Sequence, residues 1–299
     1  VFGETRVELA KADERIIGIT PAMPTGCSMN KLMNESPERF FDVGIAEGHA
    51  VTFSAGLAKD GLKPFCAIYS TFLQRAYDSI INDVAILNLP VTFCIDRAGL
   101  VGEDGVTHQG AFDLAYMRCV PNMVVAAPMN DHWLRNLMFT VQSRESGPVA
   151  IRYPRGNGVL VDWKNEFQSV EIGKGRKLAD GDKVAVLSIG HIGNNVSQVV
   201  DELRNQGINV AHYDMVFLKP LDESIMKEVG EKYKAVVTVE DGTVVGGLGT
   251  TVADWFNAHD YNVKVRKVGI PDEFVPHGTI PELYKLCKMD NESIKEIVL

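Results

Sequence analysis

The chain has 299 residues, of which 45% are hydrophobic and 23% charged, a composition typical of a globular protein that buries its core without disulfides or metals. Its formal net charge of −9 argues against a nucleic-acid or anionic-membrane surface, although a few local arginines can still hold a small anion. The five cysteines form no CxxC pair, which disfavours a disulfide framework or a zinc ribbon and favours a reducing, cytoplasmic environment.

The first half of the chain alternates apolar, strand-like runs with helical patterns. Strands are predicted at 15–20, 40–43, 64–69, 90–95, 122–126 and 148–153. Helices are predicted at 4–12, 47–59, 71–87 and 131–143. Continuous apolar strands that alternate with helices predict a parallel sheet covered on both faces.

The alternation stops at the turn-rich, polar segment 154–181 and then resumes. Further strands are predicted at 183–188, 208–213, 234–239 and 262–268, with helices at 193–206, 249–258 and at the end of the chain. We therefore expect an α/β protein of two domains, residues 1–165 and a smaller second domain of residues 166–299.

Four polar side chains follow predicted strands of the first domain. They are Glu47, Tyr69, Arg97 and Arg155. In open α/β sheets ligands bind outside the carboxyl ends of the strands, so these side chains are expected at one ligand-binding edge. Each also has a simpler interpretation: a helix N-terminal acid for Glu47, an amphipathic strand end for Tyr69, and solvated salt bridges for the arginines.

The helix predicted at 47–59 is rich in small residues. These are Ala46, Ala50, Ser54, Ala55, Gly56 and Ala58. They indicate a helix built for close approach by another element, which would bury Glu47 and require a partner for its carboxylate. His49 is expected on another side of this helix, as a hydrogen-bonded core histidine.

Three further features have a structural and a functional interpretation. The long, glycine-punctuated loop 99–110 carries Asp104 and His108, and His108 is either a proton shuttle or a surface histidine. "GHIGNN" (190–195), "EDG" (240–242) and "VGGLGT" (245–250) are interpreted as structural turns and helix starts. Cys66 and Cys94 lie in apolar strands and are expected to be inert core thiols.

Four motifs carry a resemblance to a known family. The stretches "DVGIAEGHAVTFSAGLA", "IYSTFLQRAYD", "DRAGLVGEDGVTHQGAFD" and "IRYPRGNG" closely resemble the 1-deoxy-D-xylulose-5-phosphate synthases, thiamine-diphosphate enzymes of the transketolase superfamily. The resemblance covers essentially the whole chain and implies a pyrimidine-binding domain followed by a transketolase C-terminal domain. It implies a transferase that condenses pyruvate with D-glyceraldehyde 3-phosphate, releases CO2, and serves isoprenoid, thiamine and pyridoxal biosynthesis.

The resemblance also implies a role for each matching residue. Glu47 resembles the glutamate that hydrogen-bonds a pyrimidine nitrogen of the cofactor, and Phe72 resembles the aromatic residue that stacks on that ring. The other correspondences fall into two groups, the substrate phosphate site (Tyr69, Arg97, Arg155) and polar catalytic residues near the reacting carbons (Arg75, Asp104, His108).

Two departures from the family pattern qualify these expectations. Gly48 stands where the family usually has glutamine, so packing beside the cofactor ring is expected to differ. The GDG motif that holds Mg2+ and the cofactor's diphosphate is not present in the chain. We therefore expect the chain to be part of a homodimeric synthase, inactive without its N-terminal diphosphate-binding domain.

Two other identities compete with this expectation. One is the C-terminal subunit of a split transketolase or a beta-type subunit of a 2-oxo acid dehydrogenase. The other is a non-catalytic relative, which would be expected to have lost Glu47 or the two arginines.

Overall fold

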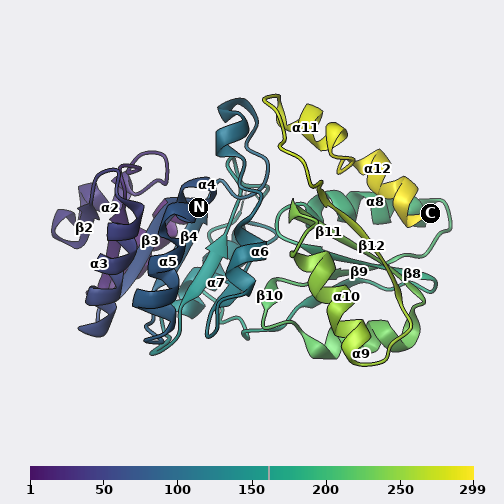
Figure 1. The fold of residues 1–299 in the computed structure, drawn as a ribbon, viewed down its shortest axis with the longest axis horizontal. Helices are drawn as coiled ribbons and strands as arrows, with labels where there is room; N and C mark the ends of the chain where they lie inside the picture. The colour runs from purple at the N-terminus through teal and green to yellow at the C-terminus, as the bar shows by residue number, and fades with distance from the viewer. Residues whose placement is uncertain (161) are drawn as a thin grey trace.

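The computed structural model describes residues 1–160 and 162–299, which form two mainly parallel sheets flanked by helices (Figure 1). The first sheet has the order β10-β5-β6-β4-β3-β1-β2. Its parallel strands are β1 (Ile16–Thr20), β2 (Phe40–Asp42), β3 (Lys63–Tyr69), β4 (Thr92–Asp96), β5 (Val124–Ala126) and β6 (Val149–Arg152). The predicted parallel sheet is confirmed.

The second sheet has the order β12-β11-β8-β9-β7. Its strands are β7 (Arg176–Ala179), β8 (Val184–Ile189), β9 (Ala211–Asp214), β11 (Ala235–Thr243) and β12 (Lys264–Ile270). Only the edge strand β7 pairs in the antiparallel direction. The chain therefore has the expected α/β fold with two sheets, the second one smaller.

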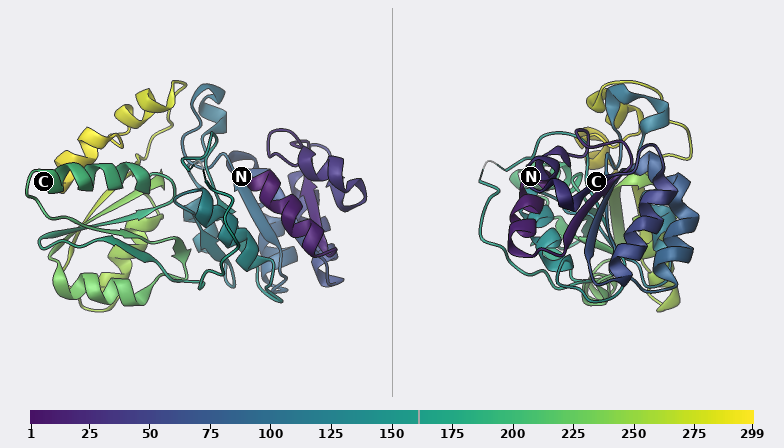
Figure 2. Two further views of the ribbon diagram at one scale, coloured as in Figure 1. Left: turned by 180° about the vertical axis from the view of Figure 1, so that it is seen from behind. Right: turned by 90° about the vertical axis from the view of Figure 1, so that its left-hand side faces the viewer.

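Helices cover both faces of each sheet. In the first part they are α1 (Phe2–Ala12), α2 (Asn30–Glu35), α3 (Glu47–Lys59), α6 (Asp113–Arg118) and α7 (Asp131–Val141). In the second part they are α8 (Gly193–Asn205), α9 (Glu223–Lys232), α10 (Leu248–Ala258), α11 (Ile280–Leu286) and α12 (Asn291–Val298). Figure 2 shows α1 and α7 on one face of the first sheet, opposite the face covered by α3. None of the helices in the described residues is long and apolar enough to cross a bilayer.

The segment predicted as one helix over 71–87 is instead broken into short pieces. It contains α4 (Ser70–Leu73), a 3-10 turn (Gln74–Ala76), α5 (Tyr77–Ser79) and a π-helical turn (Ile80–Ala85). A π turn holds more residues than an α turn and rotates the residues that follow it. Leu87, which follows the π turn, is 57% exposed.

A buried cluster of charges joins the two parts of the chain. The Arg152 guanidinium at the end of β6 donates Nε–H to Asp113 Oδ1 at 3.0 Å and pairs through Nη1 with Asp241 of β11. All three side chains are at most 2% exposed. Burial alone would raise the pKa of Asp241, but Arg152 and His191 outweigh it and hold that pKa well below its usual range.

One strand also crosses between the two parts. β10 (Phe217–Lys219) follows β9 in the chain but pairs antiparallel with β5, so the second part supplies an edge strand to the first sheet. The first sheet is therefore completed by residues that lie far along the sequence.

The cysteines are free thiols, and only Cys119 is exposed. Cys66 and Cys94 are each 1% exposed, as predicted for core thiols. Burial raises the pKa of Cys66 to about 12 and raises that of Cys94 as well, so both remain protonated and unreactive.

Candidate functional site

The residues predicted at strand ends lie at one edge of the first sheet. Tyr69 ends β3 and pairs in register with Asp96, the last residue of the neighbouring strand β4. Arg97 follows β4 directly, and Arg155 lies three residues beyond the end of β6, which pairs with β4. Parallel strands place their carboxyl ends together, so residues distant in the sequence meet here.

Tyr69, Arg97 and Arg155 lie together around Asp104. The Arg97 guanidinium lies over the Tyr69 ring, 3.7 Å from its centroid. Asp104 Oδ2 lies 3.5 Å from Arg97 Nε and 3.3 Å from Arg155 Nη1. Each arginine has a second acidic neighbour, Asp96 at 3.6 Å from Arg97 and Glu103 at 3.4 Å from Arg155. Two planar guanidinium groups side by side can bind a phosphate that displaces one of these carboxylates.

The local backbone aims Arg97 into this group. Arg97 has a left-handed φ of +56°, which is uncommon for a residue other than glycine and is typical of functional turns. The Asp96 carboxylate accepts the Arg97 amide N–H at 2.7 Å and holds this turn. Burial raises the pKa of Asp96 to about 6, against the opposing effect of Arg97.

Glu47 and Phe72 lie on the other side of Tyr69. Glu47 is the first residue of α3, is 5% exposed, and accepts Nη1–H of Arg75 at 2.9 Å. The same guanidinium lies 5.3 Å from the Phe72 ring centroid, and Phe72 stacks on Tyr69 with centroids 5.6 Å apart. Contacts therefore run without a break from Glu47 to Arg97.

The environment of Glu47 and Phe72 fits an aminopyrimidine ring. In this structure the exposed, planar guanidinium of Arg75 stands where such a ring would bind. It donates a hydrogen bond to the Glu47 carboxylate and lies over the Phe72 ring, and these are the two interactions that an aminopyrimidine would need. A carboxylate acceptor and a stacking surface thus face one space, which Arg75, with 62% of its side chain exposed, enters from solvent.

Loop 99–110 brings His108 next to Phe72. An antiparallel bridge closes the base of the loop, with the Gly99 amide N–H donated to Gly110 O at 2.8 Å. The His108 ring packs edge-on against Phe72 at 5.3 Å, and its Nδ1 lies 3.0 Å from Thr107 Oγ1. All eight residues that the sequence singled out for the site are therefore connected by contacts.

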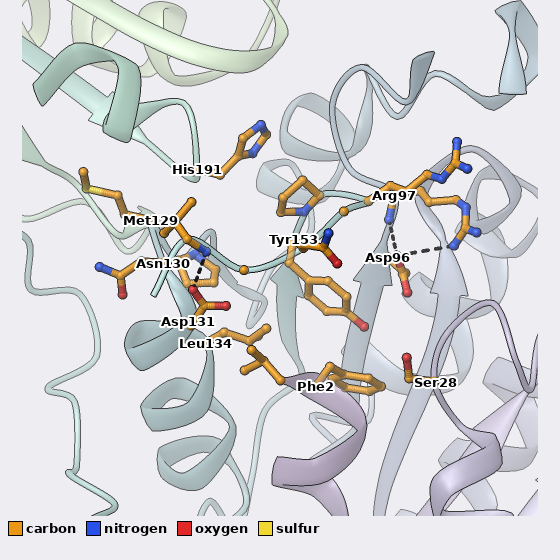
Figure 3. A pocket seen from close by; sticks show the side chains of 18 of the residues that line it. Phe2, Ser28, Asp96, Arg97, Met129, Asn130, Asp131, Leu134, Tyr153 and His191 are labelled. Atoms are coloured by element: carbon orange, nitrogen blue, oxygen red, sulfur yellow. Dashed lines mark hydrogen bonds and ion pairs between the residues drawn. The ribbon is translucent and has the colours of Figure 1, made fainter. Parts of the chain in front are cut away.

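A cavity of about 230 Å³ opens beside the arginines (Figure 3). Figure 3 shows Asp96 and Arg97 on one side, Asp131 on the other, and Tyr153 between them. Sequence reasoning missed Asp96, which ends β4, and Tyr153, which follows β6 directly, although the rule used for Arg97 would have found both. It also missed His191, which follows β8 of the second sheet and lines the same cavity.

Of the two expectations for α3, the core position of His49 is wrong, and the close approach of another element is confirmed. His49 is exposed and stacks on Phe53 at 6.1 Å, because two residues after Glu47 the helix faces solvent and not the core. Most of the small residues are buried inside this chain, with Ala50 and Ser54 both 0% exposed against neighbouring elements, and Gly56 is one that stays exposed. Close approach to α3 thus comes mainly from the same chain.

The glycine-rich turns are structural, as predicted. The Glu240 carboxylate accepts the amide N–H groups of Leu248 and Gly249 at 2.8 and 2.9 Å, which fixes the start of α10. Over residues 1–160 and 162–299, no cluster of three or more His, Cys, Asp or Glu side chains is placed to hold a metal ion.

Known proteins resemble this chain along almost its whole length. The family model "Transketolase, pyrimidine binding domain" matches residues 1–159, and "Transketolase, C-terminal domain" matches residues 173–294. Curated relatives named 1-deoxy-D-xylulose-5-phosphate synthase include those of Bacteroides thetaiotaomicron, 59% identical over 100% of this chain, and Parabacteroides distasonis, 57% identical over 98%. The chain spans 46% of the length of each of these relatives.

A solved structure covers almost the same length as this chain. It is described as "Split gene transketolase, inactive beta4 tetramer" and is 29% identical, with a TM-score of 0.86. The match covers 99% of this chain and 95% of that one. The arrangement of two sheets is therefore shared with a protein of similar extent.

Proposed function

Since the chain belongs to the transketolase family, we propose that residues 1–165 and 166–299 are the pyrimidine-binding and C-terminal domains of a 1-deoxy-D-xylulose-5-phosphate synthase. The reaction is the condensation of pyruvate with D-glyceraldehyde 3-phosphate, with release of CO2. The identity to synthases over the whole chain supports this reaction within the family. The observation that carries the proposal is the unbroken set of contacts from Glu47, through Phe72 and Tyr69, to Arg97.

Glu47 and Phe72 are proposed to hold the pyrimidine ring of thiamine diphosphate. When bound, this cofactor supplies the electron sink for decarboxylation. Glu47 is buried, and its carboxyl group, which accepts from Arg75 in this structure, could instead share a proton with a ring nitrogen in a hydrogen bond. The Arg75 side chain is mostly exposed, so it can swing toward solvent when the pyrimidine ring binds. It would then remain beside the ring, close to the reacting groups.

Arg97 and Arg155 are proposed to bind the phosphate of the aldehyde substrate, with Tyr69 as the surface that orients Arg97. A phosphate accepts bidentate hydrogen bonds from guanidinium groups and replaces the carboxylate of Asp104 between them. Asp104 is then free to interact with a substrate hydroxyl.

His108 is proposed to move a proton at the aldehyde oxygen of the acceptor. Its ring lies at the edge of Phe72, on the path between the phosphate group and the cofactor ring. Imidazole is the side chain best suited to proton transfer near neutral pH.

The diphosphate of the cofactor and its Mg2+ are proposed to bind outside these 299 residues. Support comes from the coverage of the relatives, of which this chain matches 46%, and from the GDG motif that its sequence lacks. The 299-residue chain should therefore bind thiamine diphosphate weakly and not turn over. Isothermal titration with thiamine diphosphate and Mg2+ tests this, and micromolar binding would contradict it.

The assembled protein is further proposed to be a cytoplasmic homodimer, in which a second copy covers the exposed side of α3 around Gly56. Sedimentation of the assembled protein measures its oligomeric state directly. A protein that stays monomeric at high concentration would oppose the proposal.

Complementation tests the reaction. The chain is mixed with a separately expressed diphosphate-binding half of a relative, and CO2 release from pyruvate is measured with and without glyceraldehyde 3-phosphate. Release that depends on both partners and on the aldehyde supports the synthase.

A split transketolase is the second candidate. The solved structure described as a split gene transketolase aligns with this chain over 95% of its own length. A transketolase would transfer a two-carbon unit from a ketose phosphate and release no CO2. Formation of product from a ketose donor, with none from pyruvate, would favour this second candidate.

A further inference from the structure

Gln109 closes loop 99–110 on itself and ties it to the second domain. Its side chain is only 6% exposed, and its Oε1 accepts the amide N–H of Val101 at 2.9 Å. Its Nε2 donates to the carbonyl oxygen of Pro276 at 3.3 Å, a residue 167 positions later in the chain. One side chain thus connects both ends of the loop with the segment that leads into α11.

Other parts of the loop also rest on the second domain. The amide N–H of Thr243 donates to Ala111 O at 2.8 Å, just after the loop. The Asp241 carboxylate lies so close to Gly99 that a Cβ there would be 2.2 Å from Oδ2. Figure 1 shows the loop after β4 beside the chain that enters α11. The loop is therefore supported at its base and at its outer turn by the second domain.

The loop carries two of the proposed catalytic side chains. Asp104 sits between the guanidinium groups of Arg97 and Arg155, and the His108 ring meets Phe72 at its edge. His108 directly precedes Gln109, so a shift of the Gln109 backbone moves the imidazole.

We propose that Gln109 is a positioning residue, through which the C-terminal domain sets the place of His108 and Asp104 in the site. The inference rests on the proposed function, in which these two side chains act on the aldehyde. An amide suits the task because it accepts from one partner and donates to another at the same time. A glutamate at this position keeps only the acceptor, and a methionine keeps neither interaction.

The attachment of the loop is tested in the 299-residue chain. Gln109→Met should speed hydrogen exchange of the Val101 amide by about tenfold or more, because the Gln109 side chain is its acceptor, while Gln109→Glu should preserve its protection. Both variants should be cleaved faster than the parent by a protease within residues 101–108, since both release Pro276. Gln198→Met is the matched control, because Gln198 accepts an exposed hydrogen bond from Asn291 remote from the loop.

The positioning role is tested in the full-length enzyme. Both Gln109 variants should lower kcat by about tenfold to a hundredfold, as expected when catalytic groups are displaced by about 1 Å, and KM for the aldehyde should change much less. A role limited to stability would leave kcat of the folded enzyme equal to that of Gln198→Met, and this result would overturn the proposal.

Failure of the proposed function has a separate signature. If the parent enzyme releases no CO2 from pyruvate, the proposed reaction is wrong. Hydrogen exchange of Val101 and proteolysis within residues 101–108 still decide whether Gln109 attaches the loop to the second domain. Unchanged Val101 exchange in Gln109→Met, or unchanged cleavage in both variants, overturns the inference whatever the reaction.

Discussion

Replacement of Arg152 with methionine should destabilise the whole chain strongly. The guanidinium lies between Asp113 and Asp241, whose side chains are both 0% exposed, and it supplies hydrogen bonds to both. Methionine fills a similar volume but removes the guanidinium that the two buried carboxylates share, leaving Asp241 with His191 alone. The loss is therefore electrostatic and not a loss of packing.

The expected magnitude follows from the burial of the pair. Removal of one partner from a buried ion pair costs about 3–5 kcal/mol, a large share of the about 5–15 kcal/mol by which domains are stable. The same substitution at Arg15, whose pair with Asp13 is half exposed, should cost less than about 1 kcal/mol. Denaturant unfolding of the three proteins measures the difference.

The pH dependence separates this explanation from a packing defect. In the parent chain, Arg152 and His191 keep the pKa of Asp241 low despite burial. Without Arg152, only His191 opposes the effect of burial on Asp241, so the pKa of Asp241 rises, and the folded variant is expected to bind a proton that the unfolded chain does not bind. The variant should gain stability relative to the parent as the pH falls from about 8 to about 5. A difference that is constant over this range, or below about 1 kcal/mol, would refute the reasoning.

Four further predictions follow from single sites. In the full-length enzyme, Glu47→Gln should slow proton–deuterium exchange at the thiazolium carbon of the cofactor, and parent-like exchange would contradict its role. Arg97→Ala and Arg155→Ala should each raise KM for glyceraldehyde 3-phosphate by about tenfold or more, from a loss of about 1.5–3 kcal/mol of charge-assisted bonding, with pyruvate affected less. Burial lowers the pKa of His212 to about 4, so this side chain should contribute a loss of up to about 3 kcal/mol of stability as the pH falls from 6.5 to 4; the difference between the parent and His212→Gln measures it, because the raised pKa values of Asp96 and Glu240 act in the opposite direction in both proteins. Gly56→Ala should stabilise the isolated chain by about 1 kcal/mol in thermal unfolding, since a methyl group there meets no atom within 4 Å.

Local patterns were sufficient for most of the fold. The helix at 47–59 was predicted with the bounds that the structure gives, because its start and its apolar spacing are local properties. β10 was not predicted, because three residues before Pro220 form a strand only through pairing with β5, far earlier in the chain. The break in the helix after Ser70 was also missed, since the apolar spacing of a π turn resembles that of an α-helix over one or two turns.

The site shows the same division between local and distant information. The strand-end rule placed Tyr69, Arg97 and Arg155 together, since it needs only the order of strands. The link from Gln109 to Pro276 spans 167 positions, and that from Arg152 to Asp241 spans 89. Such pairs leave no periodic signal in one sequence, so only the folded structure reveals them.

These distant links explain why the second domain matters although few of its side chains face the cavity. Asp241 holds Arg152, Arg152 holds Asp113, and Asp113 accepts the hydroxyl of Ser70 at 3.1 Å, the residue directly after Tyr69. A displacement of the second domain would thus be transmitted through these buried charges to Ser70 and to the neighbouring Tyr69, whose ring lies under the Arg97 guanidinium. Residues 1–165 without the second domain would also lack β10 and would retain Arg152 with only one of its two carboxylates. The two parts are therefore not expected to be stable when separated, and the arrangement of Tyr69, Arg97 and Arg155 is expected to depend on both.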